Sequence, residues 1–339
     1  MKTALITGIS GQDGAFLAKN LLNKGYRVVG ADRRSADSFR WRLDWLGIQD
    51  KVEIVYFDLL EFTNILNIID NIKPDEVYNL AAQSFVKASF DQPILTSDVD
   101  AIGPLRILEA IRTVDKNIKF YQASTSEMFG KIQDKHQDES TPFYPRSPYG
   151  VAKLYAHWIT KNYRESYNMF ACSGILFNHE SELRGSEFVT KKIVESISRI
   201  SLGSDEVLSM GNLDATRDWG HAEDYVEGMY LIMNHKIADD FVLSTGYTTS
   251  VRKFLELAAK EVNIDIEWKG NGLNEIGMNP VNGKTIVNIS PEFFRPAEVD
   301  VLIGNSSKAL NTLGWKPQIH VEELVSRMIK FELQKLKNS

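Results

Sequence analysis

Tyr149 and Lys153 are a pair of residues whose types and spacing could do chemistry. They stand at positions i and i+4, so a helix would place both on one face. A nearby ammonium stabilises a phenolate and so lowers the pKa of the phenol. A tyrosine activated in this way can remove a proton from a sugar hydroxyl. The same spacing also arises by chance, so the pair gains its weight from the residues around it.

A polar run from Ser124 to Glu127 follows an expected strand at Lys119–Ala123. In a parallel sheet, the carboxyl ends of the strands open onto the cleft. There Thr125 could donate a hydrogen bond to the oxygen that Tyr149 deprotonates, and Glu127 would add a carboxylate beside it. Simple hydride transfer needs no such carboxylate, so Glu127 indicates a further acid–base step. The alternative for Glu127 is an acid at a helix start, stabilised by the helix dipole.

Three glycines, Gly8, Gly11 and Gly14, lie between the first expected strand and the first expected helix. Glycines at such a turn let the backbone approach a pyrophosphate, which then sits at the positive end of the helix. Their Gly-x-x-Gly-x-x-Gly spacing differs slightly from the usual dinucleotide fingerprint, and a plain tight turn is the alternative. Because the turn follows an N-terminal strand, we favour a dinucleotide site.

The end of the second expected strand gives conflicting signals about the cofactor. Asp32 is typical of a residue that accepts hydrogen bonds from a free ribose 2′-hydroxyl, which favours NAD. Arg33 and Arg34 follow it, and paired guanidinium groups suit a 2′-phosphate, which favours NADP. The arginines could instead be solvated or contact a neighbouring subunit. Asp58, after the third strand, is either an adenine contact or a helix cap.

The order of elements that must position these residues predicts an α/β fold. Short β-branched runs alternate with amphipathic segments, as in a Rossmann-type, doubly wound parallel sheet, because parallel strands need long crossover connections. We expect a cofactor domain at residues 1–178. Residues 179–339 should form mainly a smaller α/β substrate lobe, with an approximate boundary and a chain that crosses between the lobes. The expected strands are Thr3–Thr7, Arg27–Ala31, Val52–Phe57, Glu76–Ala81, Lys119–Ala123 and Phe170–Phe177, and the expected helices include Gly14–Lys24, Val189–Leu202, Ala222–Asn234, Val251–Val262 and Val321–Leu336.

Composition and charge narrow the classes of function. The chain has 339 residues, of which 43% are hydrophobic and 25% charged, enough for a sizeable core. Its formal charge of −6 argues against a general nucleic-acid or polybasic membrane surface. Cys172 is the only cysteine in the sequence, so we expect neither a disulfide framework nor a metal site. With no signal sequence or membrane-spanning stretch evident, we expect a cytoplasmic protein.

Six ordered segments, spread over almost the whole chain, carry a family resemblance. They are Ala4–Gly14 (ALITGISGQDG), Phe120–Gly130 (FYQASTSEMFG), Thr141–Lys153 (TPFYPRSPYGVAK), Gly174–Ser181 (GILFNHES), Arg217–Ala222 (RDWGHA) and Phe294–Val299 (FRPAEV). Together they are far more specific than any one alone. On these segments the sequence resembles the extended short-chain dehydrogenase/reductase superfamily and, within it, the GDP-mannose 4,6-dehydratase family.

The resemblance implies a hydro-lyase that converts GDP-mannose to GDP-4-keto-6-deoxymannose, with transient oxidation of carbon 4 by bound NADP. It implies a homotetramer, in which the loop after the second strand (Arg34, Ser35 and Ser38) reaches toward a neighbour's cofactor. The implied catalytic group is Thr125, Glu127, Tyr149 and Lys153. The implied cofactor contacts are Gly8, Gly11, Gln12, Asp13, Gly14, Asp32, Arg33, Arg34, Asp58, Leu59, Leu80, Ala81 and Ala82, together with Tyr149 and Lys153. The implied GDP-sugar contacts are Ser84, Ser126, Asn178, Arg184, Val189, Lys192, Arg217, Arg295 and Glu298.

The sequence also departs from the family pattern. Family members often carry His where Phe85 stands, Pro-Arg where Glu182 and Leu183 stand, and Glu where Ser186 stands. The first alternative is therefore a GDP-D-glycero-D-manno-heptose 4,6-dehydratase with the same mechanism. A sugar-nucleotide epimerase or 4-ketoreductase is a second alternative, but it would not need Glu127. We expect His179 to be a structural hydrogen-bond donor rather than a ligand.

Overall fold

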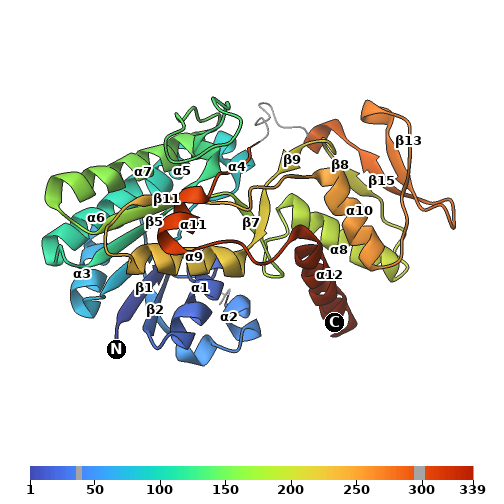
Figure 1. Cartoon of the computed structure of the whole chain (residues 1–339). Coiled ribbons are helices and arrows are strands. Elements are labelled where there is room, and N and C mark those ends of the chain that lie inside the picture. Colours follow the sequence, from blue (N-terminus) through green and yellow to red (C-terminus); the bar gives the residue numbers. More distant parts are fainter. Residues whose placement is uncertain (36–39, 294–301, 339) are drawn as a thin grey trace.

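A seven-stranded sheet forms the centre of the larger part of the molecule (Figure 1). The structure is a computed structural model that describes residues 1–35, 40–293 and 302–338. Every neighbouring pair of strands in this sheet is parallel. The strands, in spatial order, are β11 (Asp240–Leu243), β6 (Ala171–Leu176), β5 (Lys119–Thr125), β4 (Glu76–Asn79), β1 (Thr3–Thr7), β2 (Arg27–Asp32) and β3 (Glu53–Tyr56).

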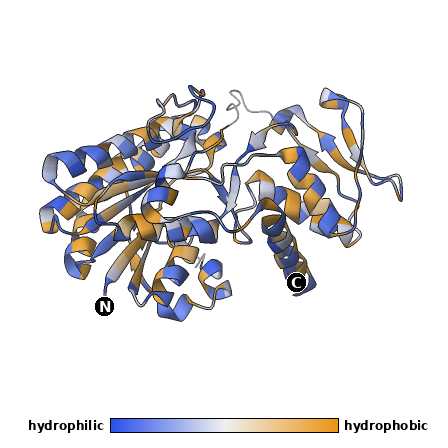
Figure 2. Ribbon diagram, viewed as in Figure 1, coloured by the Kyte–Doolittle hydropathy of each residue, from blue (hydrophilic) through white to orange (hydrophobic). Residues whose placement is uncertain are grey.

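Helices cover both faces of this sheet, as a parallel sheet requires. In β1, Ala4 and Ile6 pack on the face covered by α1 (Gln12–Asn23) and α9 (Ala222–Asn234). Leu5 points to the opposite face. Figure 2 shows the strands of the sheet as mainly hydrophobic and the helices as mixed. The opposite face is covered by α3 (Phe62–Ile72), α6 (Gly103–Val114) and α7 (Pro148–Tyr167), and the shorter helices of this part are α2 (Trp41–Trp45), α4 (Val86–Asp91), α5 (Pro93–Ser97) and α11 (Ser307–Leu313).

The smaller part has its own hydrophobic core between three helices and a mixed four-stranded sheet. The helices are α8 (Val189–Ser201), α10 (Val251–Glu261) and α12 (Val321–Asn338). The sheet consists of β13 (Glu267–Lys269), β14 (Ile276–Met278), β15 (Thr285–Ile289) and β8 (Leu208–Met210). Two short strand pairs lie where the chain passes between the parts: β7 (Asn178–Glu180) with β10 (Trp219–His221), and β9 (Thr216–Arg217) with β12 (Thr249–Ser250).

The predicted α/β fold with a parallel sheet is confirmed. The six predicted strands all belong to the large sheet, with ends that shift by a few residues. The seventh strand, β11, and the helix α9 come from the second half of the chain, so the chain returns to the sheet after leaving it. Among the described residues, no helix combines the length and the apolar character needed to cross a membrane.

A chain of buried polar side chains ties together the carboxyl ends of three central strands. The hydroxyl of Thr7 donates to Asn79 Oδ1 at 2.7 Å, and the amide of Asn79 donates to Gln122 Oε1 at 2.8 Å. Thr7 Oγ1 also accepts hydrogen bonds from the backbone N–H groups of Leu80 and Ala81, each at 3.1 Å. Buried polar groups that satisfy one another in this way fix a unique arrangement. The strand ends that precede the candidate site are therefore held in register.

Candidate functional site

A cavity of about 890 Å³ opens at the carboxyl ends of the parallel strands and extends to the smaller part of the molecule. Arg34 is exposed and does not line it, and Arg295 and Glu298 lie outside the described residues. All the other predicted site residues line this one cavity: Gly8, Gly11, Gln12, Asp13, Gly14, Asp32, Arg33, Asp58, Leu59, Leu80, Ala81, Ala82, Ser84, Thr125, Ser126, Glu127, Tyr149, Lys153, Asn178, Arg184, Val189, Lys192 and Arg217.

The glycine turn between β1 and α1 has the shape of a phosphate cradle. Gly8 has a φ of +70°, and a Cβ atom there would come within 2.9 Å of the Ala81 nitrogen. A Cβ on Gly14 would clash with the carbonyl oxygen of Gly8. No side chain caps the first turn of α1, which begins after Gly11. The helix N-terminus therefore keeps backbone N–H groups that can bind an anion, so the turn fits the pyrophosphate of a dinucleotide.

Tyr149 and Lys153 lie on the first turns of α7, as their spacing predicts. The helix begins at Pro148, and the Ser147 side chain caps it by accepting a hydrogen bond from the Gly150 N–H at 3.0 Å. Lys153 is buried, and its ammonium donates to the carbonyl oxygen of Ala123 at 3.1 Å. Its Nζ lies 5.8 Å from the centre of the Tyr149 ring. The cap and the β5 carbonyl thus fix both side chains at the cavity wall.

The pKa of Tyr149 departs from the expectation that Lys153 lowers it. Burial of the phenol disfavours the phenolate, and the negative charges of Asp100 and Glu127 add to this effect, so the pKa of Tyr149 is raised. A hydrogen bond with Thr125 acts in the opposite direction but does not outweigh burial. Burial also lowers the pKa of Lys153. In this structure Tyr149 therefore holds its proton more tightly than an exposed tyrosine.

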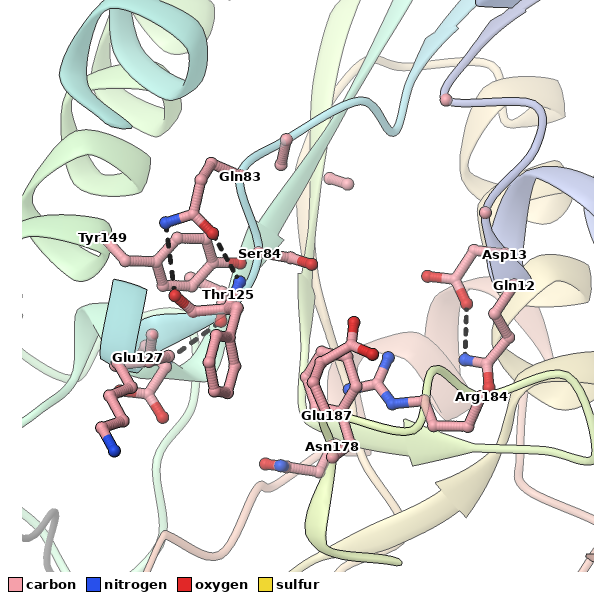
Figure 3. A pocket seen from close by; sticks show the side chains of 18 of the residues that line it. Gln12, Asp13, Gln83, Ser84, Thr125, Glu127, Tyr149, Asn178, Arg184 and Glu187 are labelled. Atoms are coloured by element: carbon pink, nitrogen blue, oxygen red, sulfur yellow. Dashed lines mark hydrogen bonds between the residues drawn. The ribbon is translucent and has the colours of Figure 1, made fainter. Parts of the chain in front are cut away.

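Glu127 lies on the same side of the cavity as Tyr149 and Thr125 (Figure 3). It follows β5 in a short 3₁₀ turn, Ser126–Met128, whose N-terminus is capped by the Thr125 side chain. The Thr125 hydroxyl oxygen accepts a hydrogen bond from the Glu127 backbone N–H at 3.2 Å. Ser84 points into the cavity from the segment after β4. A hydroxyl, a phenol and a carboxylate therefore surround one space.

Basic side chains line the part of the cavity that faces the smaller lobe. Arg184 pairs with Glu180 at 3.0 Å, and its guanidinium stacks 3.4 Å from the centre of the Phe188 ring. Lys192 donates to the Ser209 carbonyl oxygen at 2.7 Å. Arg217, on β9, donates a hydrogen bond to the carbonyl oxygen of Thr216. Together with the N-terminus of α8, which no side chain caps, these cations can neutralise a diphosphate.

The opposite end of the cavity holds Asp32 and Arg33. Asp32 Oδ1 accepts a hydrogen bond from the Arg33 N–H at 3.0 Å, and the Arg33 side chain is exposed. Asp58 Oδ1 accepts from the Leu60 N–H at 3.0 Å, so it caps a local turn while it lines the cavity. The helix-cap alternative for Asp58 is wrong, because Glu61 caps α3 by accepting a hydrogen bond from the Thr63 N–H; the adenine contact stays a prediction.

The side chains of Gln12 and Asp13 connect the glycine turn to β7 and the residues that follow it. Gln12 Oε1 accepts a hydrogen bond from the Ser181 hydroxyl at 2.7 Å. Asp13 Oδ2 lies 2.8 Å from His179 Nε2, and His179 Nδ1 lies 2.7 Å from the Phe177 carbonyl oxygen. Because a carboxylate and a carbonyl only accept, both ring nitrogens of His179 donate, and the ring is an imidazolium. His179 is a structural donor in this arrangement.

Several residues that line the cavity were not predicted as site residues. Gln83 and Glu187 line it, and Phe85, noted only as a departure from the family, packs edge-to-face on Phe188 with ring centres 6.2 Å apart. Gln83 could have been found, because it follows β4 next to the predicted Ser84. Glu187 carries no such signal, since its place depends on where the chain turns into α8. Ser186, another departure from the family, is exposed and does not line the cavity.

Comparison with known proteins gives a consistent result over the whole chain. The model of a family described as GDP-mannose 4,6 dehydratase matches residues 5–328. A GDP-mannose 4,6-dehydratase of Yersinia enterocolitica is 49% identical, over 99% of this chain and 95% of that protein. A GDP-mannose 4,6 dehydratase of Homo sapiens is 48% identical, over 99% of this chain and 92% of that protein.

Solved structures share the fold at much lower sequence identity. A dTDP-glucose 4,6-dehydratase from Streptomyces venezuelae has a TM-score of 0.83 at 18% identity, and the alignment covers 99% of this chain and 98% of that one. A UDP-glucose 4-epimerase from Thermotoga maritima has a TM-score of 0.83 at 22% identity, covering 98% and 99%. At these identities the likeness extends to the fold alone.

The ion pair between Asp13 and His179 should make stability depend on pH. Burial alone would raise the pKa of Asp13 and lower that of His179, but their mutual attraction outweighs it. The pKa of Asp13 falls to about 2, and that of His179 rises above its usual 6.5. The stabilisation should therefore be complete between about pH 4 and 6.5, and it should be lost as the pH rises through the raised pKa of His179.

Thermal melts of His179→Gln against the unchanged protein test this. We expect a deficit of about 1.5–3 kcal/mol at pH 5.5, as for a hydrogen bond to a charged group, and a smaller deficit at pH 9. His320→Gln, at an exposed position, is the control and should cost little at either pH. The same deficit for His179→Gln at both pH values would contradict an imidazolium at this position.

Proposed function

Because the chain belongs to the GDP-mannose 4,6-dehydratase family, we propose that it converts GDP-mannose to GDP-4-keto-6-deoxymannose and water with the residues of this cavity. The observation that carries the proposal is the presence of Tyr149, Thr125 and Glu127 around one space, reached by both the glycine turn and the basic lobe. An epimerase or ketoreductase would need the phenol and the ammonium but not the carboxylate.

In the proposed chemistry, Tyr149 handles the proton of the carbon 4 hydroxyl and Glu127 handles the proton on carbon 5. Tyr149, paired with Lys153, takes the proton of the carbon 4 hydroxyl, and Thr125 donates a hydrogen bond to the same oxygen. The ketone formed at carbon 4 acidifies the hydrogen on carbon 5. Glu127 then removes that proton and passes it to the departing carbon 6 hydroxyl, which leaves as water. Carbon 5 then takes a proton from solvent, Tyr149 releases the proton of the carbon 4 hydroxyl to solvent, and carbon 6 would become a methyl group with the hydride that the bound nicotinamide returns.

The residues present fit a nicotinamide dinucleotide, and we propose NADP. The glycine turn and the N-terminus of α1 would hold its pyrophosphate, while Asp32 and Arg33 would contact its adenosine ribose. When bound, the oxidised nicotinamide supplies a positive charge to the site and accepts a hydride that it returns later in the cycle. That positive charge would oppose the effect of burial on Tyr149.

The proposed substrate site lies in the smaller lobe. Arg184, Lys192 and Arg217 would neutralise the diphosphate, and Asn178 would contact sugar hydroxyls. Arg295 and Glu298 belong to the same proposal through the family resemblance. We also propose that residues 1–178 form the cofactor domain and that residues 179–339 form mainly the sugar-nucleotide lobe. The proposed location of the protein is the cytoplasm.

Product analysis tests the activity directly. Mass spectrometry of the product from GDP-mannose should show the loss of one water, and GDP-manno-heptose, assayed in parallel, should be converted more slowly. Faster dehydration of GDP-manno-heptose would mean that this sugar nucleotide, and not GDP-mannose, is the preferred substrate. An unchanged mass from both sugars would contradict the dehydratase assignment.

Glu127→Gln separates dehydration from binding. The amide keeps the size of the carboxylate and its hydrogen-bonding capacity but cannot act as a base. General acid–base groups contribute about 10²–10⁴-fold, so dehydration should fall by that factor while GDP-mannose still binds. In deuterated water, the unchanged enzyme should place deuterium at carbon 5. Dehydration by Glu127→Gln at the normal rate, or a product that keeps its original carbon 5 hydrogen, would refute this role.

Arg33→Ala tests the proposed preference for NADP. A charge-assisted hydrogen bond to a 2′-phosphate is worth about 1.5–3 kcal/mol, so the variant should lose about tenfold or more in affinity for NADP relative to NAD. Calorimetric titration of both cofactors gives the ratio. Arg27→Ala, at the other end of β2 and paired with Glu53, should leave it unchanged. Equal affinities of the unchanged protein for the two cofactors would count against the preference.

We further propose a homotetramer built from dimers. On α7, Val151, Tyr155 and Trp158 are exposed, and Ile94 on the adjacent α5 is exposed as well. Such apolar side chains gathered on neighbouring helices are typical of an interface. Light scattering should give a tetramer at micromolar concentration. Trp158→Glu should reduce the mass, and Val281→Glu, on the distant smaller lobe, should not. A monomer of the unchanged protein would contradict this proposal.

A further inference from the structure

Asp100 is a buried carboxylate next to the site, and the chemistry described above does not use it. Its residue is 1% exposed. It lies in a single π-helical turn, η2 (Asp98–Ile102), between α5 and α6. Such turns are rare and recur at functional sites. Its neighbour Val99 lines the cavity. The position of Asp100 therefore calls for a physical explanation.

The two oxygens of Asp100 have different surroundings. Oδ1 accepts a hydrogen bond from the Gln83 backbone N–H at 2.8 Å. Gln83 in turn accepts a hydrogen bond from the Phe85 N–H through its side chain, so Asp100 helps to hold the segment that carries Ser84 and Phe85. Oδ2 is fully buried and has no hydrogen-bond partner among the described residues. A carboxylate left half satisfied in the interior is costly, which points to a role that offsets the cost.

Asp100 interacts electrostatically with both Tyr149 and Lys153. The turn η2, which carries Asp100, packs directly against α7, which carries Tyr149 and Lys153. Lys153, 3% exposed, is the cation that lowers the pKa of Asp100, and the negative charge of Asp100 acts to raise the pKa of both Tyr149 and Lys153. The adjacent α5 has no charged residue in its sequence. On α6, Arg106 is paired with Asp98, on the same turn as Asp100 but partly exposed. Asp13 also acts to raise the pKa of Lys153, and Glu127 and Arg184 act on Tyr149 in opposite directions. Among the charges that act on either member of the pair, Asp100 has the largest effect.

We propose that Asp100 is a positioning residue of the reaction: it balances the buried charge of Lys153, anchors the Gln83–Phe85 segment, and opposes a negative charge on Tyr149. This rests on the proposed function. Tyr149 has to accept the carbon 4 proton and retain it while Glu127 carries out the elimination. A fixed negative charge nearby favours the protonated phenol and so helps it to retain that proton.

Asp100→Asn tests the role of the charge, because the amide keeps an oxygen that can accept from Gln83. Without the charge, the Tyr149 phenolate becomes easier to form and the Lys153 ammonium easier to lose. The whole pH profile of kcat should therefore move to lower pH, by about one unit. Asp98→Asn, on the same turn, is the matched control and should leave the profile in place. A lower kcat for Asp100→Asn with an unmoved profile would mean a structural role only and would overturn the proposal.

A second measurement does not depend on activity. Burial raises the pKa of Asp100 from 3.8 to about 6, although Lys153 pulls it down. The folded state therefore binds more protons than the unfolded state between these values, and ionised Asp100 costs stability as the pH rises from 4 to 7. Asp100→Asn escapes this cost, so its Tm relative to the unchanged protein should rise by several degrees across that range. A Tm difference that is constant with pH would contradict a buried charge on Asp100.

Lys153→Met provides a third variant should Asp100→Asn not fold. Removal of the ammonium leaves Asp100 without its compensating charge, so the pH range over which stability falls should shift upward. An unshifted range would show that the two groups are not coupled and would overturn the proposal. If the unchanged protein dehydrates neither sugar nucleotide, the proposed function fails, while the Tm measurements still decide whether Asp100 carries a buried charge coupled to Lys153.

Discussion

Seven parallel strands end at one edge of the large sheet, and the whole candidate site depends on this constraint. Parallel pairing brings the glycine turn after β1, Ser84 after β4, and Thr125 at the end of β5 to the same edge, although long stretches of chain separate them. The buried contacts among Thr7, Asn79 and Gln122 hold three of these ends together. The edge is thus rigid before any ligand binds, and this pre-organisation favours catalysis.

The chemistry at this edge is controlled by burial as much as by neighbouring charge. Tyr149, Lys153 and Asp100 are all buried, and desolvation opposes the charged form of each. The pair of Asp13 and His179 shows the opposite balance, because direct contact lets attraction outweigh desolvation. Asp13 and His179 thus have an oppositely charged partner in direct contact, whereas the hydrogen bond of Lys153 is to the uncharged Ala123 carbonyl oxygen. The pKa of Tyr149 can therefore still be changed by a bound ligand.

The sequence predicted the parts of the site that rest on local chain order. The glycine turn and the spacing of Tyr149 and Lys153 follow from short segments, and the structure brings them to one cavity. The contact of Asp13 with His179 joins residues far apart in the chain, so no local pattern contains it. The raised pKa of Tyr149 depends on its burial in the folded chain, which no local pattern contains. Asp100 has no signal in the sequence because its place depends on how α5, η2 and α7 pack on one another. Arg33 lines the cavity but Arg34 does not, so two arginines that are adjacent in the sequence need not belong to the same site.

The central claim is that one cavity oxidises carbon 4, removes water across carbons 5 and 6, and reduces carbon 6 without releasing the sugar between steps. The most direct test is conversion of GDP-[4-²H]mannose, mixed with an equal amount of fully ¹³C-labelled GDP-mannose that carries no deuterium. NMR of the product should show deuterium in the methyl group at carbon 6, and only in molecules without ¹³C. Deuterium found in the ¹³C-labelled product, retained at carbon 4 or lost to water would contradict the account.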